Sequence, residues 1–282
     1  MEIAWLAVGN TNERGMGTIM SRKFLWALCA ALFIALPAQA ASIVGGSSML
    51  GASEAAQLET WLGQGSLTLT NIFTKGVTGT TSTDWHNTVD NQGATFSIME
   101  MVAYDPSQGQ NVTQIVGGYN PQSWDASIGN WVITPNDADR TAFIFNLTTG
   151  VLHRQCRSTD PVICGYDNDT GPDNWIGQYQ TFNRIDFGPT FGNGQDLFVG
   201  STLNFGLSSN YSYGVAGGLP GSGSLNGLDP NPTGYHWVSV GDLETFTVAV
   251  SPNDVPAPGA LALFGLGLLG LGVMRRRTGN AG

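Results

Sequence analysis

Short stretches in which apolar and polar residues alternate with a period of two recur between residues 66 and 250. Such alternation indicates β-strands that bury one face, because successive side chains of a strand point to opposite sides. Clusters of Gly, Pro, Asn and Asp separate these stretches, as is typical of turns. The pattern predicts strands at residues 66–73, 95–103, 114–116, 130–133, 142–147, 185–187, 197–203 and 244–250.

One helix is predicted before the first of these strands, at residues 53–62, where apolar residues share one helical face. Ser53 is the expected N-cap, and Gly63 is expected to end the helix. We expect one domain over residues 53–250. Its predicted fold class is mainly β (α+β), a two-layer antiparallel β-sandwich with a few short helices.

An export signal is predicted at residues 20–40, which combine a basic start, an apolar stretch and an A-x-A cleavage site. The small residues of that site are Ala38 and Ala40, so the mature chain is expected to begin at Ala41. Residues 1–19 have no targeting pattern, and we interpret them as a spurious extension from a misassigned start codon. An uncleaved membrane anchor is the alternative interpretation of the apolar stretch.

A second apolar segment follows the body at residues 259–274, after a Pro-rich linker at residues 251–258. A helix of this length spans about 24 Å, so with bilayer thinning it can cross a membrane. The arginines that follow favour a cytoplasmic end, which would place the body outside. The residues that define the predicted signal are Val255, Pro256, Ala257, Pro258, Arg275, Arg276 and Arg277.

Those three parts, in this order at the end of a chain, resemble the PEP-CTERM sorting signals of Gram-negative bacteria. The resemblance covers residues 255–277 and implies processing by an exosortase, a membrane-embedded transpeptidase-like enzyme, during export to the surface. We therefore expect a protein that is anchored in the inner membrane in transit and then reaches the cell surface or the medium. The family usually has Glu between the prolines, where this chain has Ala257, and this departure bears on processing more than on membrane insertion.

The charge of the expected body limits its partners. The whole chain has a net charge of −10, and residues 41–258 hold 19 acidic and five basic residues, a net charge of −14. A phosphate backbone would be repelled, so we exclude nucleic-acid binding. Such a charge suits solubility outside the cell and the binding of divalent cations.

Two cysteines, Cys156 and Cys164, remain once the predicted signal is removed. A close pair in an exported chain predicts a disulfide. Closing so short a loop would stabilise the fold by roughly 2.5 kcal/mol through the entropy of the unfolded chain. A redox or metal site is the alternative, although no second histidine accompanies the nearby His153.

Four blocks of the body, followed by a closing strand, resemble TLDc domains in their order and spacing. The blocks are residues 84–101, 114–124, 139–148 and 187–199, and the closing strand is residues 242–250. The matching positions are Trp85, His86, Gly117, Gly118, Tyr119, Trp124, Asp125, Gly188, Pro189, Phe191 and Gly192. Residues 154–175, which hold the cysteine pair, are interpreted as an insertion.

The TLDc resemblance implies a β-sandwich flanked by helices, and no accepted catalytic centre defines that family. Its eukaryotic members are linked to oxidative-stress protection and to the vacuolar ATPase. An exported bacterial protein would not meet that pump, so the resemblance implies a fold and a binding role without a partner.

A corner of the fold is predicted at residues 117–127, which read GGYNPQSWDAS. Gly117 and Gly118 are expected to permit close backbone approach or positive φ. Trp124 is expected to anchor the returning chain, and Asp125 to cap a turn. A catalytic role for this stretch is the alternative.

Catalytic groups are sparse. As a general base, His86 would need a nucleophile and an orienting carboxylate, and no nucleophile turn occurs, so a structural role is favoured. Glycoside hydrolysis needs two convergent carboxylates. The candidates for such a pair are Glu100, Asp105, Asp125 and Asp186.

An Asp-rich stretch supplies the best candidate for a metal site. Oxygen ligands at alternating positions suit a weak Ca²⁺ site, and the candidate ligands are Asp167, Asp169 and Asp173. A metal-free Asx-rich turn is the alternative. No cofactor is expected otherwise.

Two functions follow from these patterns. The first is an exported, non-catalytic surface or extracellular-matrix protein, associated with exopolysaccharide in a biofilm or with a surface protein. The alternative is a secreted, carboxylate-dependent polysaccharide hydrolase. Trp124, Trp131 and Trp175 are candidates for a sugar-binding surface, although buried Trp anchors are the commoner use.

Overall fold

The computed structural model describes residues 41–105, 108–158, 175–209, 211–214, 225 and 236–250. In this part the fold is mainly β, as predicted, with two α-helices and three 3-10 helices. These are α2 (Ala52–Leu62), α3 (Ser82–Val89), η1 (Ala126–Ile128), η2 (Asp137–Asp139) and η3 (Trp175–Gln178). None of them is long and apolar enough to cross a membrane. The predicted signal peptide and C-terminal membrane segment lie outside the described residues.

The strands of the described residues join into one sheet, in which β1–β2 is the one parallel pair of these strands. Their bounds are β1 (Ser42–Val44), β2 (Leu67–Thr74), β3 (Thr95–Asp105), β4 (Gln110–Asn120), β5 (Asn130–Ile133), β6 (Phe143–Asn146), β7 (Val151–Gln155), β8 (Tyr179–Asn183), β9 (Thr190–Phe191), β10 (Leu197–Val199), β11 (Phe205–Ser208), β12 (Tyr213–Gly214) and β13 (His236–Val250). The order is β12-β7-β6-β4-β3-β13-β11-β10-β9-β8-β5, and β2 joins β13 and β1.

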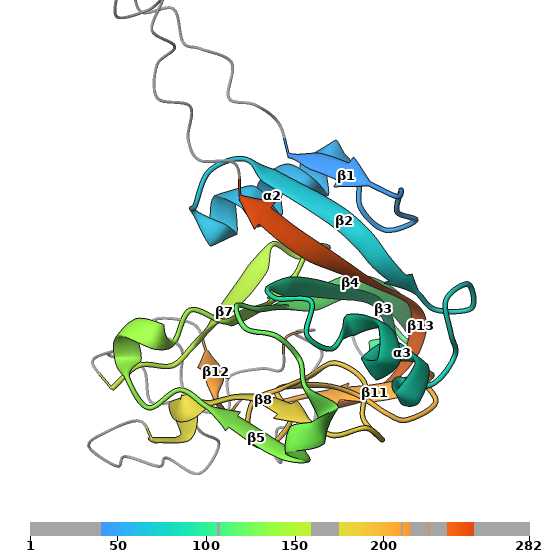
Figure 1. Cartoon of the computed structure of the whole chain (residues 1–282). Coiled ribbons are helices and arrows are strands. Elements are labelled where there is room, and N and C mark those ends of the chain that lie inside the picture. The colour runs from blue at the N-terminus through green and yellow to red at the C-terminus, as the bar shows by residue number, and fades with distance from the viewer. Residues whose placement is uncertain are drawn as a thin grey trace, which may run out of the picture. The chain divides into compact units, whose positions relative to one another are not determined.

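The long strand β13 connects the two layers of this sheet. Its first residues pair with β11, its last residues pair with β2, and the register shifts between Val240 and Leu243. The Lys75 ammonium holds this bulge by donating to the carbonyls of Val240 (3.0 Å) and Gly241 (2.6 Å). The sheet folds back here, so that β5, β8 and β11 lie below β3 and β4 (Figure 1). The predicted antiparallel layers are thus parts of one continuous sheet.

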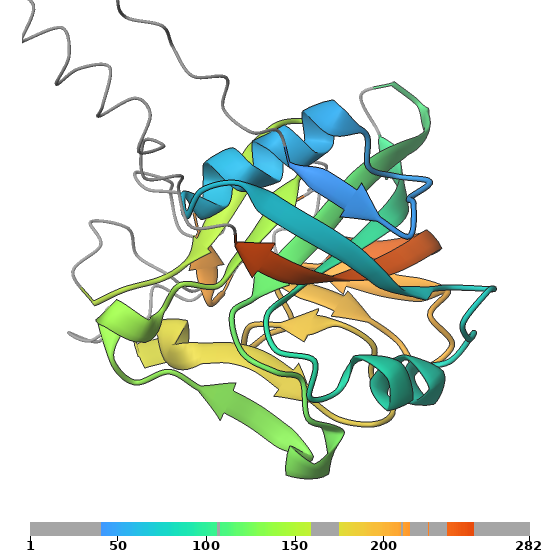
Figure 2. The same cartoon turned by 45° about the horizontal axis from the view of Figure 1, so that its top comes forward.

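Alternation along β3 supplies two cores. Met99 and Met101 face the space between the layers, where they join a buried cluster with Phe191 of the lower layer. Phe96 and Ile98 face the other side and form a second cluster beneath α2, which covers the outer face of the upper layer (Figure 2). Each fully buried large apolar side chain stabilises the fold by about 1.5–3 kcal/mol.

Helix α2 confirms the helix predicted at residues 53–62, but its cap differs. Ser53 is not the N-cap: Gly51 takes that position, and its backbone N–H donates to the Glu54 carboxylate (2.9 Å). A carboxylate at the third helical position can thus replace a hydroxyl at the cap. Gly63 ends the helix as predicted, with φ of 68° in the left-handed region.

Four predicted strands are confirmed with small changes of bounds as β2, β3, β5 and β6, whereas the strand predicted at residues 197–203 ends at Val199 as β10 and the one predicted at residues 244–250 begins at His236 as β13. The strand predicted at residues 185–187 is wrong, because these residues form a turn in which the Phe187 N–H donates to the Arg184 carbonyl (3.0 Å). The strand predicted at residues 114–116 is the centre of the much longer β4. Arg154 and Gln155, the first residues of the predicted insertion, belong to β7.

Candidate functional site

The two glycines of the predicted corner lie inside β4, where they make room for neighbours. Neither has positive φ. A Cβ at Gly117 would lie 2.5 Å from the Ser97 carbonyl oxygen, and one at Gly118 would lie 2.5 Å from ring atoms of Phe191. Of the two expected roles, close approach is therefore confirmed and positive φ is wrong. Gly118 allows the lower layer to pack directly on the backbone of the upper one, whereas Gly117 makes room for the neighbouring strand β3 and for the Phe145 ring of the upper layer.

An aromatic cluster joins three of the TLDc-like blocks at this place. The Trp124 ring lies edge-on to Trp85 (5.0 Å between centroids) and to Phe191 (5.4 Å). All three side chains are fully buried. The indole N–H of Trp124 donates to Thr95 Oγ1, and that of Trp85 donates to Thr245 Oγ1, both at 2.9 Å. Trp124 is thus the predicted anchor, and its burial removes it from any sugar-binding surface.

The other predicted family positions lie in several parts of the fold. Tyr119, on β4, packs against Phe96 beneath α2, and burial raises the pKa of its hydroxyl. Gly188 and Pro189 lead into β9, and Gly192 follows it with φ of 78°. These positions shape the strands and turns of the core.

His86 ties α3 to two other segments. Its Nδ1 lies 2.7 Å from Asp90 Oδ1, and its Nε2 lies 2.9 Å from the Arg184 carbonyl oxygen and 3.0 Å from that of Phe187. Asp90 Oδ2 in turn accepts the N–H of Ala126 (2.7 Å). Both ring nitrogens of this 2 %-exposed side chain therefore face protein acceptors.

Helix α3, which positions His86, was not predicted from the sequence. It starts with a reciprocal cap in which Thr81 Oγ1 accepts the Asp84 N–H (3.2 Å) and Asp84 accepts the Thr81 N–H (3.0 Å). The spacing Thr-x-x-Asp, a variant of the capping box, is the signal that could have revealed it.

Two of the candidate carboxylates lie on β3 and cannot form a hydrolytic pair. Glu100 and Asp105 are five residues apart, so they lie about 16 Å apart along the strand and point to opposite faces. A glycosidase pair needs a separation of roughly 5 to 9.5 Å. Asp105 is also buried and accepts a hydrogen bond from the Gln108 amide (2.7 Å).

The other two carboxylates lie near His86 and are hydrogen-bonded. Asp125 caps η1, as predicted, by accepting the N–H of Ser127 (2.9 Å). Hydrogen bonds from Ser127 lower the pKa of Asp125, and the charge of His86 contributes a smaller part. Asp186 forms a bidentate pair with Arg184, which lowers the pKa of Asp186, again with a smaller part from His86.

A buried carboxylate that the sequence did not reveal lies at Asp196. It is fully buried and accepts the N–H groups of Ser212 (2.9 Å) and Tyr213 (3.1 Å), which fixes the segment at β12. Burial raises the pKa of Asp196 to about 7, while these backbone donors act in the opposite direction.

A row of aromatic rings crosses the outer face of the lower layer. Consecutive centroids lie 4.2, 5.4, 5.0 and 6.0 Å apart. Register places the strand members on one side, because Trp131 pairs with Phe182 while the neighbouring Thr181 pairs with the inward-facing Phe191. The aromatic row consists of Trp131, Phe182, Phe187, Phe198 and Phe205.

The aromatic row is open to solvent at one end. Phe205 is 41 % exposed, and Trp237 on the adjacent β13 is 64 % exposed. Trp237 pairs with Leu207, which pairs with Phe198, so its ring belongs to the same face. The Arg184 guanidinium stacks over Phe187 at 4.9 Å. Trp131 was a candidate for a sugar-binding surface and is a member of this row, whereas the other rings were not among the candidates.

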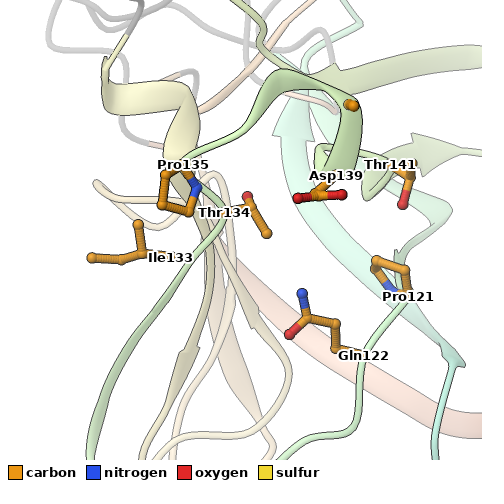
Figure 3. Close-up of a pocket in the computed structure, with 8 residues that line it drawn as sticks. Pro121, Gln122, Ile133, Thr134, Pro135, Asp139 and Thr141 are labelled. Atoms are coloured by element: carbon orange, nitrogen blue, oxygen red, sulfur yellow. The ribbon is translucent and has the colours of Figure 1, made fainter.

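A pocket of about 360 Å³ opens beside the corner (Figure 3). It is lined by Pro121 and Gln122, which follow β4, and by Ile133, Thr134 and Pro135 at the end of β5. The Thr134 side chain points toward Gln122, whereas that of Ile133 points away from it (Figure 3). The η2 segment closes it with Ala138, Asp139 and Thr141.

The remaining predicted residues lie wholly or partly outside the described part of the chain. Cys156 is buried just after β7, but Cys164 lies outside, so the disulfide stays a prediction. The Ca²⁺ candidates Asp167, Asp169 and Asp173 also lie outside, as do the side chain of Trp175, the cleavage site and the sorting signal. Within the described residues no three His, Cys, Asp or Glu side chains are grouped to hold a metal ion.

Comparison with known families finds one match, to the PEP-CTERM protein-sorting motif over residues 254–277. The match confirms the predicted resemblance of the tail. It indicates an exported protein that passes through a membrane-anchored intermediate and is processed by an exosortase. No curated protein matches the chain, and the TLDc resemblance stays a prediction.

Proposed function

We propose that the protein is an exported, non-catalytic binding protein of the cell surface or extracellular matrix, whose TLDc-like body holds extracellular polysaccharide. The observation that carries the proposal is the aromatic row with the exposed Trp237 beside it. Aromatic faces offer large, rigid contact area at little cost in side-chain entropy. A sheet face with rings in a line suits an extended, repeating polymer.

The state of the candidate catalytic groups supports a non-catalytic role. Both nitrogens of His86 face protein acceptors, Asp186 is paired with Arg184, and Asp125 caps a turn. A general acid or base must instead reach a proton of the substrate. In the structure these groups instead contact other groups of the protein.

The arrangement of the TLDc-like blocks supports a shared fold. The blocks that hold β6, β4 and β3 and the closing strand within β13 are four neighbours in the sheet. The fourth block brings Phe191 onto Gly118 between the layers. Blocks that are distant in the chain thus meet in one core.

The body is attached to the outside of the cell in this proposal through its tail. The match at residues 254–277 supports sorting by an exosortase-type enzyme. The close cysteine spacing supports a Cys156–Cys164 disulfide in that oxidising location.

The test is retention of the mature protein in native gels that contain a neutral polysaccharide, together with an assay for released reducing ends. We expect retarded migration without turnover, and weaker retardation for Trp237→Ala and Phe205→Ala. Leu62→Ala, on α2 at the other side of the upper layer, is the matched control and should migrate like the wild type. Release of reducing ends that is lost in Glu100→Gln or Asp186→Asn would establish the hydrolase instead.

A further inference from the structure

The pocket beside the corner continues the sheet face that carries the aromatic row. Ile133, which lines it, follows Trp131 by two residues on β5, so both side chains point to the same side of that strand. Its volume of about 360 Å³ falls within the range of small-molecule sites. A polymer lying on the aromatic row would therefore reach the pocket with one of its units.

Three polar side chains in the pocket are available to a ligand. The Gln122 amide and the Thr141 hydroxyl make no hydrogen bond to any residue that the structure describes, and both side chains are exposed. Among the described residues the Asp139 carboxylate accepts one hydrogen bond, from Asn136 Nδ2 to Oδ2 (3.1 Å), and its Oδ1 accepts none. An amide, a carboxylate and a hydroxyl together supply the donors and acceptors that neighbouring hydroxyl groups require.

The wall opposite Gln122 is fixed before any ligand arrives. The buried Arg140 guanidinium donates to the carbonyls of Thr134 (3.0 Å), Pro135 (3.0 Å) and Cys156 (2.9 Å). The Thr134 backbone N–H also donates to the Gln178 carbonyl (2.7 Å). A wall held this way loses little conformational freedom on binding, which favours affinity for a small ligand.

The charge of the pocket favours neutral over acidic sugars. Asp139 is the one charged side chain among the described residues that line the pocket. The nearby Arg140 guanidinium does not offset this charge, because it is bonded to backbone carbonyls and paired with Asp137 (2.9 Å). The body around it has a net charge of −14 over residues 41–258. An acidic sugar would meet like charge in the pocket and on approach.

We infer that this pocket binds one neutral, hydroxyl-rich sugar unit, with Gln122, Asp139 and Thr141 hydrogen-bonding its hydroxyl groups and Pro121 and Pro135 packing on its apolar surface. The inference rests on the proposed function, because it names the class of polysaccharide that the aromatic row holds. Neutral glycans are bound and uronic-acid-rich ones are not.

The test is calorimetric titration of the mature protein with two neutral tetrasaccharides, cellotetraose and maltotetraose, and with the acidic tetragalacturonate. We expect a neutral tetrasaccharide to bind, the acidic one not to bind, and both Gln122→Ala and Thr141→Val to weaken binding about tenfold, the loss of one hydrogen bond of roughly 1.4 kcal/mol. Asp139→Asn should reduce the difference in affinity between the neutral tetrasaccharides and tetragalacturonate. Matched controls are Gln92→Ala and Asp242→Asn, exposed residues outside the pocket, which should bind like the wild type.

The outcomes separate the two proposals. Binding of a neutral tetrasaccharide that Gln122→Ala and Thr141→Val leave unchanged, stronger binding of tetragalacturonate, or retention of neutral polysaccharide without binding of either neutral tetrasaccharide would each overturn the pocket inference alone. Absence of retention on every polysaccharide would overturn the proposed function. Urea unfolding of each variant checks that a loss of binding is not a loss of fold.

Discussion

Two buried groups, Asp196 and His153, should change the stability of the fold with pH in opposite directions. Burial raises the pKa of Asp196 to about 7, whereas an unfolded Asp titrates near about 3.9. Between these values the unfolded state loses its proton and the folded state keeps it. Stability therefore falls as pH rises, by about 1.4 kcal/mol per pH unit and about 4 kcal/mol in all.

Burial of His153 has the reverse consequence. It lowers the pKa of that imidazole to about 4, whereas an unfolded His titrates near about 6.5. The contribution of neutral His153 to the free energy of unfolding is fully present above pH ~6.5. It is lost as the pH falls toward ~4, which lowers the free energy of unfolding by about 3 kcal/mol. In the wild type the two slopes nearly cancel over this window.

Single substitutions separate the two slopes. Asp196→Asn removes the acid titration, so its stability should rise between pH 4 and 6.5 by about 3 kcal/mol relative to the wild-type profile. His153→Phe removes the other, so its stability should fall over the same window by a similar amount. The measurement is urea unfolding followed by Trp fluorescence at each pH.

The readout is the difference in slope between variant and wild type, in which the other titrating groups cancel. If a substitution lowers stability by the same amount at every pH, the slope of its profile does not change. Such a loss therefore cannot be mistaken for the predicted change in pH dependence. Profiles of Asp196→Asn and wild type that run parallel from pH 4 to 7 would refute the reasoning about the buried carboxylate.

Two further predictions concern the corner between the layers. Gly118→Ala should cost about 1–3 kcal/mol of stability by overpacking against Phe191, and in urea unfolding the double variant with Phe191→Leu should recover part of that loss; purely additive losses would contradict the contact. His86→Ala should cost about 3 kcal/mol by removing the partner of Asp90 Oδ1 and of two backbone carbonyls, and a loss below about 1 kcal/mol in the same assay would show that these contacts are not needed.

The strands predicted correctly are those whose apolar residues and neighbouring turn residues are both visible in the local sequence. β5 was predicted with its full bounds. β4 was predicted too short because glycines are rare inside strands. The reason for Gly118 lies in Phe191, a residue far along the chain, and no local pattern contains it.

The candidate sites show the same division. Asp125 was predicted as a cap because its partner Ser127 is two residues away. The hydrogen bonds of His86 depend on a turn near residue 187, where a strand was predicted, so its partners were not identified. The pocket joins segments near residues 121, 133 and 139, which come together only through the sheet and the bonds of Arg140.

The central claim, an exported body sorted through its tail, is tested most directly by the intact mass of the protein recovered from the cell surface. The account predicts a chain that begins at Ala41 and ends before Arg275, with a mass 2 Da lower than the reduced form because Cys156 and Cys164 are joined. A surface protein that still carries residues 275–277, or one that retains residues 20–40, would contradict it.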